Sequence, residues 1–104
     1  MEQIIIPQND HGFDLTFPIQ DSSGNAYPLT DYVVKLKVWV PGAPTNLVVN
    51  GTCAVTDAPG GICTYTVQSA DFAIARRYLA EAELIKSGVV ESTRNFMIIV
   101  EESA

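Results

Sequence analysis

Apolar and polar residues alternate along most of the chain, as expected of strands that bury one face. In residues 13–20 the odd positions are apolar and the even positions are mostly polar, with Pro18 on the polar side. Because proline lacks an N–H, this strand is expected at the edge of its sheet or with a bulge. The pattern predicts strands over residues 3–7, 13–20, 32–40, 47–49, 53–56, 62–68, 78–84 and 93–101.

Turn-forming residues separate these strands. Asn50-Gly51 favours a tight turn that ends the short strand before it. Residues 57–61 (Asp-Ala-Pro-Gly-Gly) are typical of a hairpin loop, and the inward row of the strand after it is expected to be Cys63, Tyr65 and Val67. Ser69 is a candidate N-cap for one helical turn.

These elements indicate the fold class. Residues 70–86 have the Ala and Glu content of a helix, but the alternation in 78–84 favours a strand. The sequence therefore predicts a single all-β domain over residues 1–104, with a frayed tail at 102–104. Six or seven closely spaced strands, apart from the short N-terminal segment 3–7, indicate an antiparallel sandwich or barrel.

Two sets of residues are candidate interfaces. Alternate residues of a strand share one face, so Trp39 lies on the same face as Lys35 and Lys37. An exposed indole beside two cations would be a docking patch. The alternative is that loop 41–47 covers Trp39. Ile4, Ile5 and Ile6 form the N-terminal strand, which either completes the sheet edge or pairs with a neighbouring subunit in a homo-oligomer.

The two cysteines lie on opposite arms of the predicted hairpin. If Cys53 and Cys63 are directly opposite, their Cβ atoms are about 4.5–5.5 Å apart, close enough for a cross-strand disulfide. The other interpretation is a pair of reduced, buried thiols, and two cysteines in a chain without an export signal favour it.

Composition excludes several classes of function. The 104 residues hold 6 Lys and Arg against 12 Asp and Glu, a net charge of −6, which disfavours nucleic acid as a partner. No apolar run is long enough for a membrane span, and the first residues are not a secretory signal.

The sequence contains no recognisable set of catalytic or metal-binding residues. The single histidine, His11, lies in a polar turn, and the loop 21–25 lacks the second acidic position and the later bidentate Glu of a calcium site. Glu81 and Glu83 lie side by side on one predicted strand rather than across a cleft. The sequence therefore predicts no enzyme, no cofactor and no metal.

Three segments, read in order, resemble a known family. These are "FDLTFPIQDSSGNAYPLTDYVVKLKVWVPG", "NGTCAVTDAPGGICTYTVQSADFAIARRYLAEAELIKSG" and "NFMIIVEE". They resemble the N-terminal domain of the phage upper baseplate protein family and related small Ig-like virion proteins of tailed phages, over residues 12–101. The resemblance implies an Ig-like antiparallel β-sandwich of about seven strands in which Tyr78, near Asp71, hydrogen-bonds back to a corner of the chain. Arg76 departs from the pattern, which has glycine there.

The resemblance also implies a function. It is that of a non-enzymatic virion structural protein, an adaptor or decoration module of the tail baseplate or capsid that binds other phage structural proteins. Such a protein would be located in the virion after assembly in the cytoplasm of the host bacterium. The alternative function is a carbohydrate-binding β-sandwich that uses Trp39, Tyr32 and loop 41–47 as a sugar platform.

Overall fold

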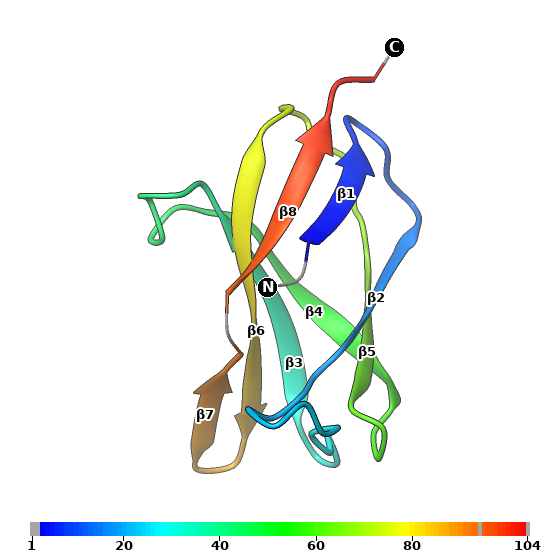
Figure 1. Cartoon of the computed structure of the whole chain (residues 1–104), viewed down its shortest axis with the longest axis vertical. Helices are drawn as coiled ribbons and strands as arrows, with labels where there is room; N and C mark the ends of the chain where they lie inside the picture. Colours follow the sequence, from blue (N-terminus) through cyan, green and yellow to red (C-terminus); the bar gives the residue numbers. More distant parts are fainter. Residues whose placement is uncertain (1–2, 94, 104) are drawn as a thin grey trace.

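The fold is all-β, as predicted. A computed structural model describes residues 3–93 and 95–103, so Arg94 of the predicted last strand and Ala104 of the predicted tail lie outside the described residues, as do positions 1 and 2. Within the described residues there is no helix (Figure 1). The strands are β1 (Gln3–Pro7), β2 (Asp14–Pro18), β3 (Val33–Trp39), β4 (Leu47–Asp57), β5 (Ile62–Thr66), β6 (Arg77–Lys86), β7 (Val89–Ser92) and β8 (Phe96–Glu101).

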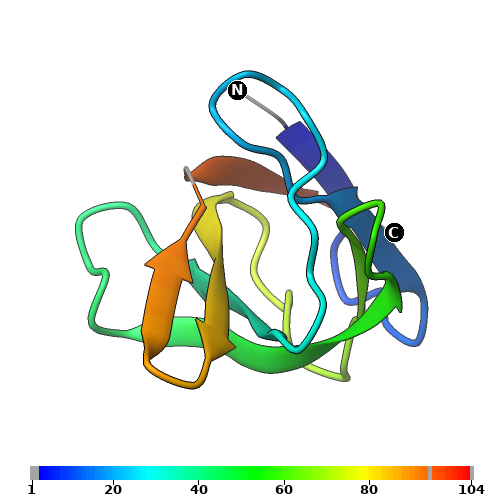
Figure 2. The ribbon, with the colours of Figure 1, turned by 90° about the horizontal axis from the view of Figure 1, so that it is seen from below.

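The strands join in one curled, mixed sheet. Its order is β1-β8-β6-β3-β4-β5-β2, with β7 paired to β6, and the sheet curls around its interior (Figure 2). All neighbours are antiparallel except β1, which lies parallel to β8 with Ile4 beside Ile98. The antiparallel arrangement expected from the sequence is therefore wrong at β1. The predicted bounds of the N-terminal strand, residues 3–7, agree with β1.

The turn predicted at Asn50-Gly51 is wrong, because β4 runs straight through it. Gly51 pairs with Leu36 of β3. A Cβ at Gly51 would lie only 3.0 Å from Cζ and 3.1 Å from Cδ1 of Tyr65, and closer still to Cε1. Glycine is needed here so that the Tyr65 ring can lie across the strand.

Two further local predictions need correction. Residues 69–73 form turns without helix; Ala70 has φ 70°, and the Asp71 carboxylate accepts the Gln68 N–H at 2.8 Å. The segment after Ser87-Gly88 does not lead directly to the last strand. It first forms the short strand β7, which pairs back onto β6.

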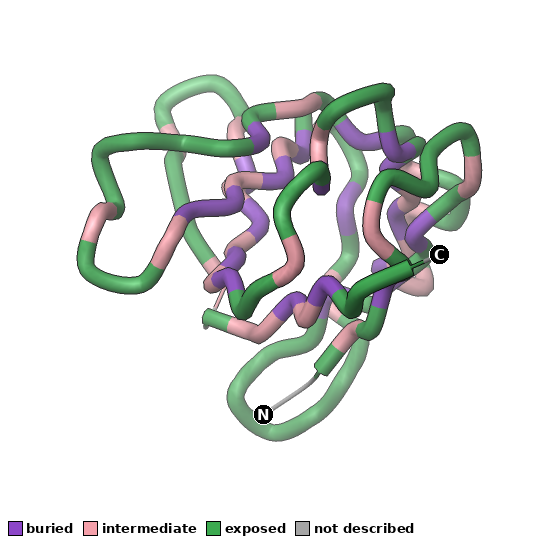
Figure 3. Tube along the Cα trace, turned by 90° about the horizontal axis from the view of Figure 1, so that it is seen from above, coloured by how far each residue is buried: buried purple, intermediate pink, exposed green. Residues whose placement is uncertain are grey.

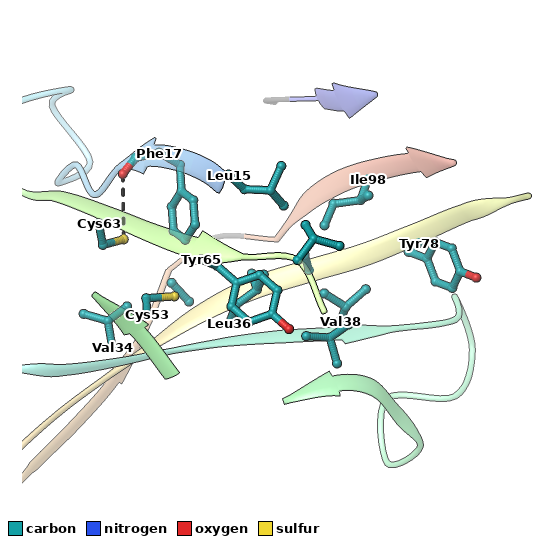
Figure 4. Close-up of a cluster of buried hydrophobic side chains, with 14 of the residues drawn as sticks. Leu15, Phe17, Val34, Leu36, Val38, Cys53, Cys63, Tyr65, Tyr78 and Ile98 are labelled. Atoms are coloured by element: carbon teal, nitrogen blue, oxygen red, sulfur yellow. Dashed lines mark hydrogen bonds between the residues drawn. The ribbon is translucent and has the colours of Figure 1, made fainter. Parts of the chain in front are cut away.

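The core consists of the inward side chains of the alternating strands. Buried and more exposed positions alternate along the strands (Figure 3). Val34, Leu36 and Val38 of β3 are fully buried, and Cys63, Tyr65 and Val67 form the predicted inward row. Leu15 and Phe17 of β2 face Ile98 of β8 across this interior (Figure 4). The alternation therefore gives each strand one apolar, inward face.

Two tyrosines tie the turn at 68–76 to the sheet. The Tyr78 hydroxyl donates to the Ile74 carbonyl at 3.0 Å, which is the back-bond that the family resemblance implied. The Tyr65 hydroxyl donates to Asp71 at 2.5 Å, and burial together with this bond raises the pKa of Tyr65. Arg76 has no positive φ, so its substitution for the family's glycine causes no backbone strain.

Candidate interaction surface

The outer face of the sheet carries a ladder of opposite charges. Lys35 and Lys37 of β3 lie directly beside Glu83 and Glu81 of β6. The Lys37 Nζ also donates diagonally to Glu83 Oε2 at 2.6 Å. We call these four residues the charge ladder. The sequence prediction that Lys35, Lys37 and Trp39 share one face is confirmed by the burial of the residues between them.

Trp39 belongs to this face but is not exposed. It pairs with Leu47 of β4 and Leu79 of β6 where β4 has a bulge, and it is only 7% exposed. A shallow pocket of about 340 Å³ beside it is lined by Lys37, Trp39, Pro44, Leu47, Glu81 and Asn95. The exposed docking patch predicted around Trp39 is therefore wrong. Of loop 41–47, which the alternative expects over the ring, Leu47 lies beside Trp39, and the ring offers little surface for a sugar.

The three N-terminal isoleucines differ in direction. Ile6 is buried in the core and Ile4 packs against it, whereas Ile5 points outward and is 57% exposed. Ile5 lies beside Ile99 of β8, next to the row formed by Met97 and Leu79. We call the four residues Ile5, Leu79, Met97 and Ile99 the Ile5 patch. The N-terminal strand thus completes the sheet edge and leaves one apolar side chain outside.

Each free edge of the sheet contains a proline. The Gln8 N–H donates to the Glu101 carbonyl at 2.8 Å, so the backbone of Gln8 points toward β8. Successive residues of a strand point their backbone N–H and C=O groups to opposite sides, so those of Pro7 point away from β8. On β2 the Ile19 N–H donates to the Gly61 carbonyl at 2.7 Å, so Pro18 likewise faces away from β5. The missing N–H of each proline falls on an unpaired edge, which confirms the edge position predicted for the Pro18 strand.

A pocket lies in the seam where the ends of the curled sheet approach each other. Phe17 of β2 and Phe96 of β8 contact across this seam, with ring centroids 5.9 Å apart. The pocket measures about 450 Å³. Its described lining residues are Ile4, Phe17, Pro18, Ile19, Gln20, Asp21, Ser22, Gly24, Thr93, Asn95 and Phe96. Periodicity could not reveal it, because β2 and β8 are far apart in the sequence.

The seam pocket has little catalytic chemistry among its described lining residues. Asp21 is their only ionisable side chain, and its Oδ1 accepts the backbone N–H groups of Ser23 and Asn25 at 2.9 and 3.0 Å. His11 lies exposed in its turn, with Nδ1 3.1 Å from the Asn9 carbonyl. Within residues 3–93 and 95–103, no three His, Cys, Asp or Glu residues are grouped to hold a metal. Nor does any helix in that part of the chain have the length and apolarity to cross a membrane.

Both cysteines are buried and free. The register of the hairpin pairs Cys63 with Val55 rather than with Cys53, so the direct opposition predicted from the sequence is wrong. The two thiols are diagonal neighbours on the inward face (Figure 4), and Cys63 Sγ donates to the Phe17 carbonyl at 3.7 Å. The neighbouring Cys53 thiol and burial raise the pKa of the Cys63 thiol, which disfavours the reactive thiolate at Cys63.

This burial predicts slow thiol chemistry in the native protein. Without reductant, we expect Cys53 and Cys63 to react with a thiol reagent such as DTNB at least about 100-fold more slowly in buffer than in urea, because labelling requires opening of the core. Two thiols should titrate once the chain is unfolded. Fast native labelling, or no thiol after unfolding, would contradict the reduced, buried pair.

The fold and these surfaces define a small all-β domain whose distinctive features are outer faces and sheet edges. A sequence model described as the BppU N-terminal domain matches residues 2–104. The chain therefore belongs to this family, the N-terminal domains of phage baseplate upper proteins, and it is a component of the virion.

Solved structures agree with the all-β fold. The N-terminal domain of phage TP901-1 ORF48 superposes with a TM-score of 0.70 at 17% identity, over 96% of this chain and 85% of that one. CopC from Methylosinus trichosporium OB3b superposes with a TM-score of 0.55 at 9% identity, over 98% and 86% of the two chains. No curated protein matches the sequence. At these identities the superpositions support the fold alone.

Proposed function

We propose that the chain is a non-enzymatic structural module of the phage baseplate that docks another virion protein through the Ile5 patch. Membership of the baseplate family supports the location and the kind of partner. The Ig-like adaptor role and assembly in the host cytoplasm belong to the same proposal.

The exposed Ile5 side chain is the observation that carries this proposal. It lies on the outermost strand, beside the half-buried Ile99, so the patch continues to the rim of the sheet. Apolar side chains gathered at a rim are typical of protein contacts. The unpaired edge of β1 beside the patch can donate only through its few remaining N–H groups, so side-chain burial is expected to supply most of the affinity.

Incorporation into phage particles tests this function. We expect Ile5→Asp, supplied to a phage that lacks the wild-type chain, to lower the amount of the chain in purified particles at least about tenfold, because the carboxylate would be desolvated in the contact. Quantitative mass spectrometry of the particles is the measurement.

Ile74→Asp is the matched control, because Ile74 is 65% exposed on the turn before β6 and is not part of the Ile5 patch. It should leave incorporation unchanged. Normal incorporation of Ile5→Asp would exclude the Ile5 patch as the docking site. Absence of the wild-type chain from particles would contradict the virion role itself.

A further inference from the structure

The charge ladder has a pattern that a second copy of the same chain can match. Along β3 and β6, Lys37 stands level with Glu81, and Lys35 stands level with Glu83. Both lysines are on one strand and both glutamates are on the other. The two lysines therefore form a positive row along β3, and the two glutamates form a negative row of equal length on the neighbouring strand β6.

We propose that two copies of the chain pack face to face through this ladder as a two-fold symmetric dimer. A symmetric contact must be self-complementary, since the same surface serves both partners. The two-fold axis of this dimer lies between the two facing sheets and runs parallel to the strands, midway between β3 and β6. A rotation about it places β3 of each copy over β6 of the other. Each lysine of one copy then faces the level glutamate of the second copy.

An apolar row next to the ladder fits the same symmetry. Val33 of β3, Ile85 of β6 and Val90 of β7 lie side by side in register. Val33 is 49% exposed and Val90 is 67% exposed. The strands that carry this row are adjacent in the lower half of the molecule (Figure 1). The axis brings Val33 of one copy over Ile85 of the second, so these two side chains are buried against each other, and Val90, one strand further out, lies at the margin of the contact.

The level-by-level match favours a second copy over an unrelated partner. In this arrangement Lys37 meets Glu81, Lys35 meets Glu83 and Val33 meets Ile85, without a like-charged pair. Within one chain, Lys37 already forms a salt bridge with Glu83, which holds both side chains in place for the contact. Ile5 itself lies on β1, which is separated from β6 by β8, so the variants that test the dimer leave Ile5 unchanged.

Sedimentation velocity of the purified chain over a range of concentrations up to about 500 µM tests the dimer. We expect the wild type to approach twice the 11.3 kDa mass of the chain as its concentration rises. The double variants Lys35→Glu/Lys37→Glu and Glu81→Lys/Glu83→Lys should each dimerise at least about tenfold more weakly, because like charges then face each other across the axis. A wild type that remains monomeric throughout would overturn the proposal.

Mixing the two double variants is the decisive measurement. In the mixed dimer every ladder position faces an opposite charge, so an equimolar mixture should dimerise more strongly than either variant alone. The fourfold exchange Lys35→Glu/Lys37→Glu/Glu81→Lys/Glu83→Lys restores the pattern within one chain and should dimerise like the wild type. Failure of both to dimerise would contradict the ladder as the contact.

Further variants guard against misfolding as an explanation. Val90→Asp changes a side chain that is already largely exposed in the single copy, so it should melt like the wild type and still weaken the dimer at least about tenfold. Arg76→Glu alters charge outside the ladder and should leave dimerisation unchanged. An unaffected dimer with Val90→Asp would remove the apolar row from the contact. Because particle incorporation of Ile5→Asp is a separate readout, either proposal can fail alone.

Discussion

Leu36→Asp is expected to abolish cooperative folding. Leu36 is fully buried at the centre of β3, between Val34 and Val38, and within the described residues no buried polar or charged side chain could pair with a carboxylate there. An unpaired buried charge costs at least about 4–5 kcal/mol, comparable to the whole stability of a small domain. Urea denaturation followed by circular dichroism should show no folded baseline.

Leu47→Asp is the matched control for this substitution. Leu47 is exposed at the start of β4, so the new carboxylate stays in water and the loss of stability should be below about 1.5 kcal/mol. A cooperative unfolding transition in Leu36→Asp would show that β3 does not bury this face.

Gly51→Ala is the substitution with the next largest expected effect. Its methyl group would occupy the place of the Tyr65 ring, whose hydroxyl is fixed by Asp71, so the ring cannot move without breaking that hydrogen bond. We expect the free energy of unfolding to fall by about 2–4 kcal/mol, measured by urea denaturation.

A double-mutant cycle separates this clash from other effects of the methyl group. In a Tyr65→Ala background the ring is gone, and Gly51→Ala should become neutral or stabilise by up to about 1 kcal/mol, because alanine restricts the unfolded chain. Equal losses in both backgrounds would mean that the ring does not explain the glycine.

Much of the fold was predictable because a strand that buries one face alternates apolar and polar residues along the sequence. This pattern identified β1, β2, β3, β6 and β8 and placed Lys35 and Lys37 on the outward face. It also resolved the competition between helix and strand around β6. These predictions succeed because they depend only on which face of a strand meets the core.

The errors come from contacts between residues distant in the sequence. Asn50-Gly51 is typical of a turn locally, but the ring of Tyr65 requires glycine inside a continuous strand. Trp39 is only 7% exposed although it lies on the outward face of β3, and alternation along the strand cannot reveal this burial. The predicted opposition of Cys53 and Cys63 requires a hairpin centred on Ala58, whereas Asp57 pairs with Ile62 and Cys63 therefore lies opposite Val55.

Pro7 and Pro18, at the two edges of the sheet, affect how the protein associates at high concentration. Open strand edges can add further strands without limit, which is how amyloid fibrils grow. Each proline lacks an N–H, so one donor is missing from the row of backbone groups to which a further strand would bond. At high local concentration the molecule is therefore directed toward closed assemblies formed through its faces, and away from fibres.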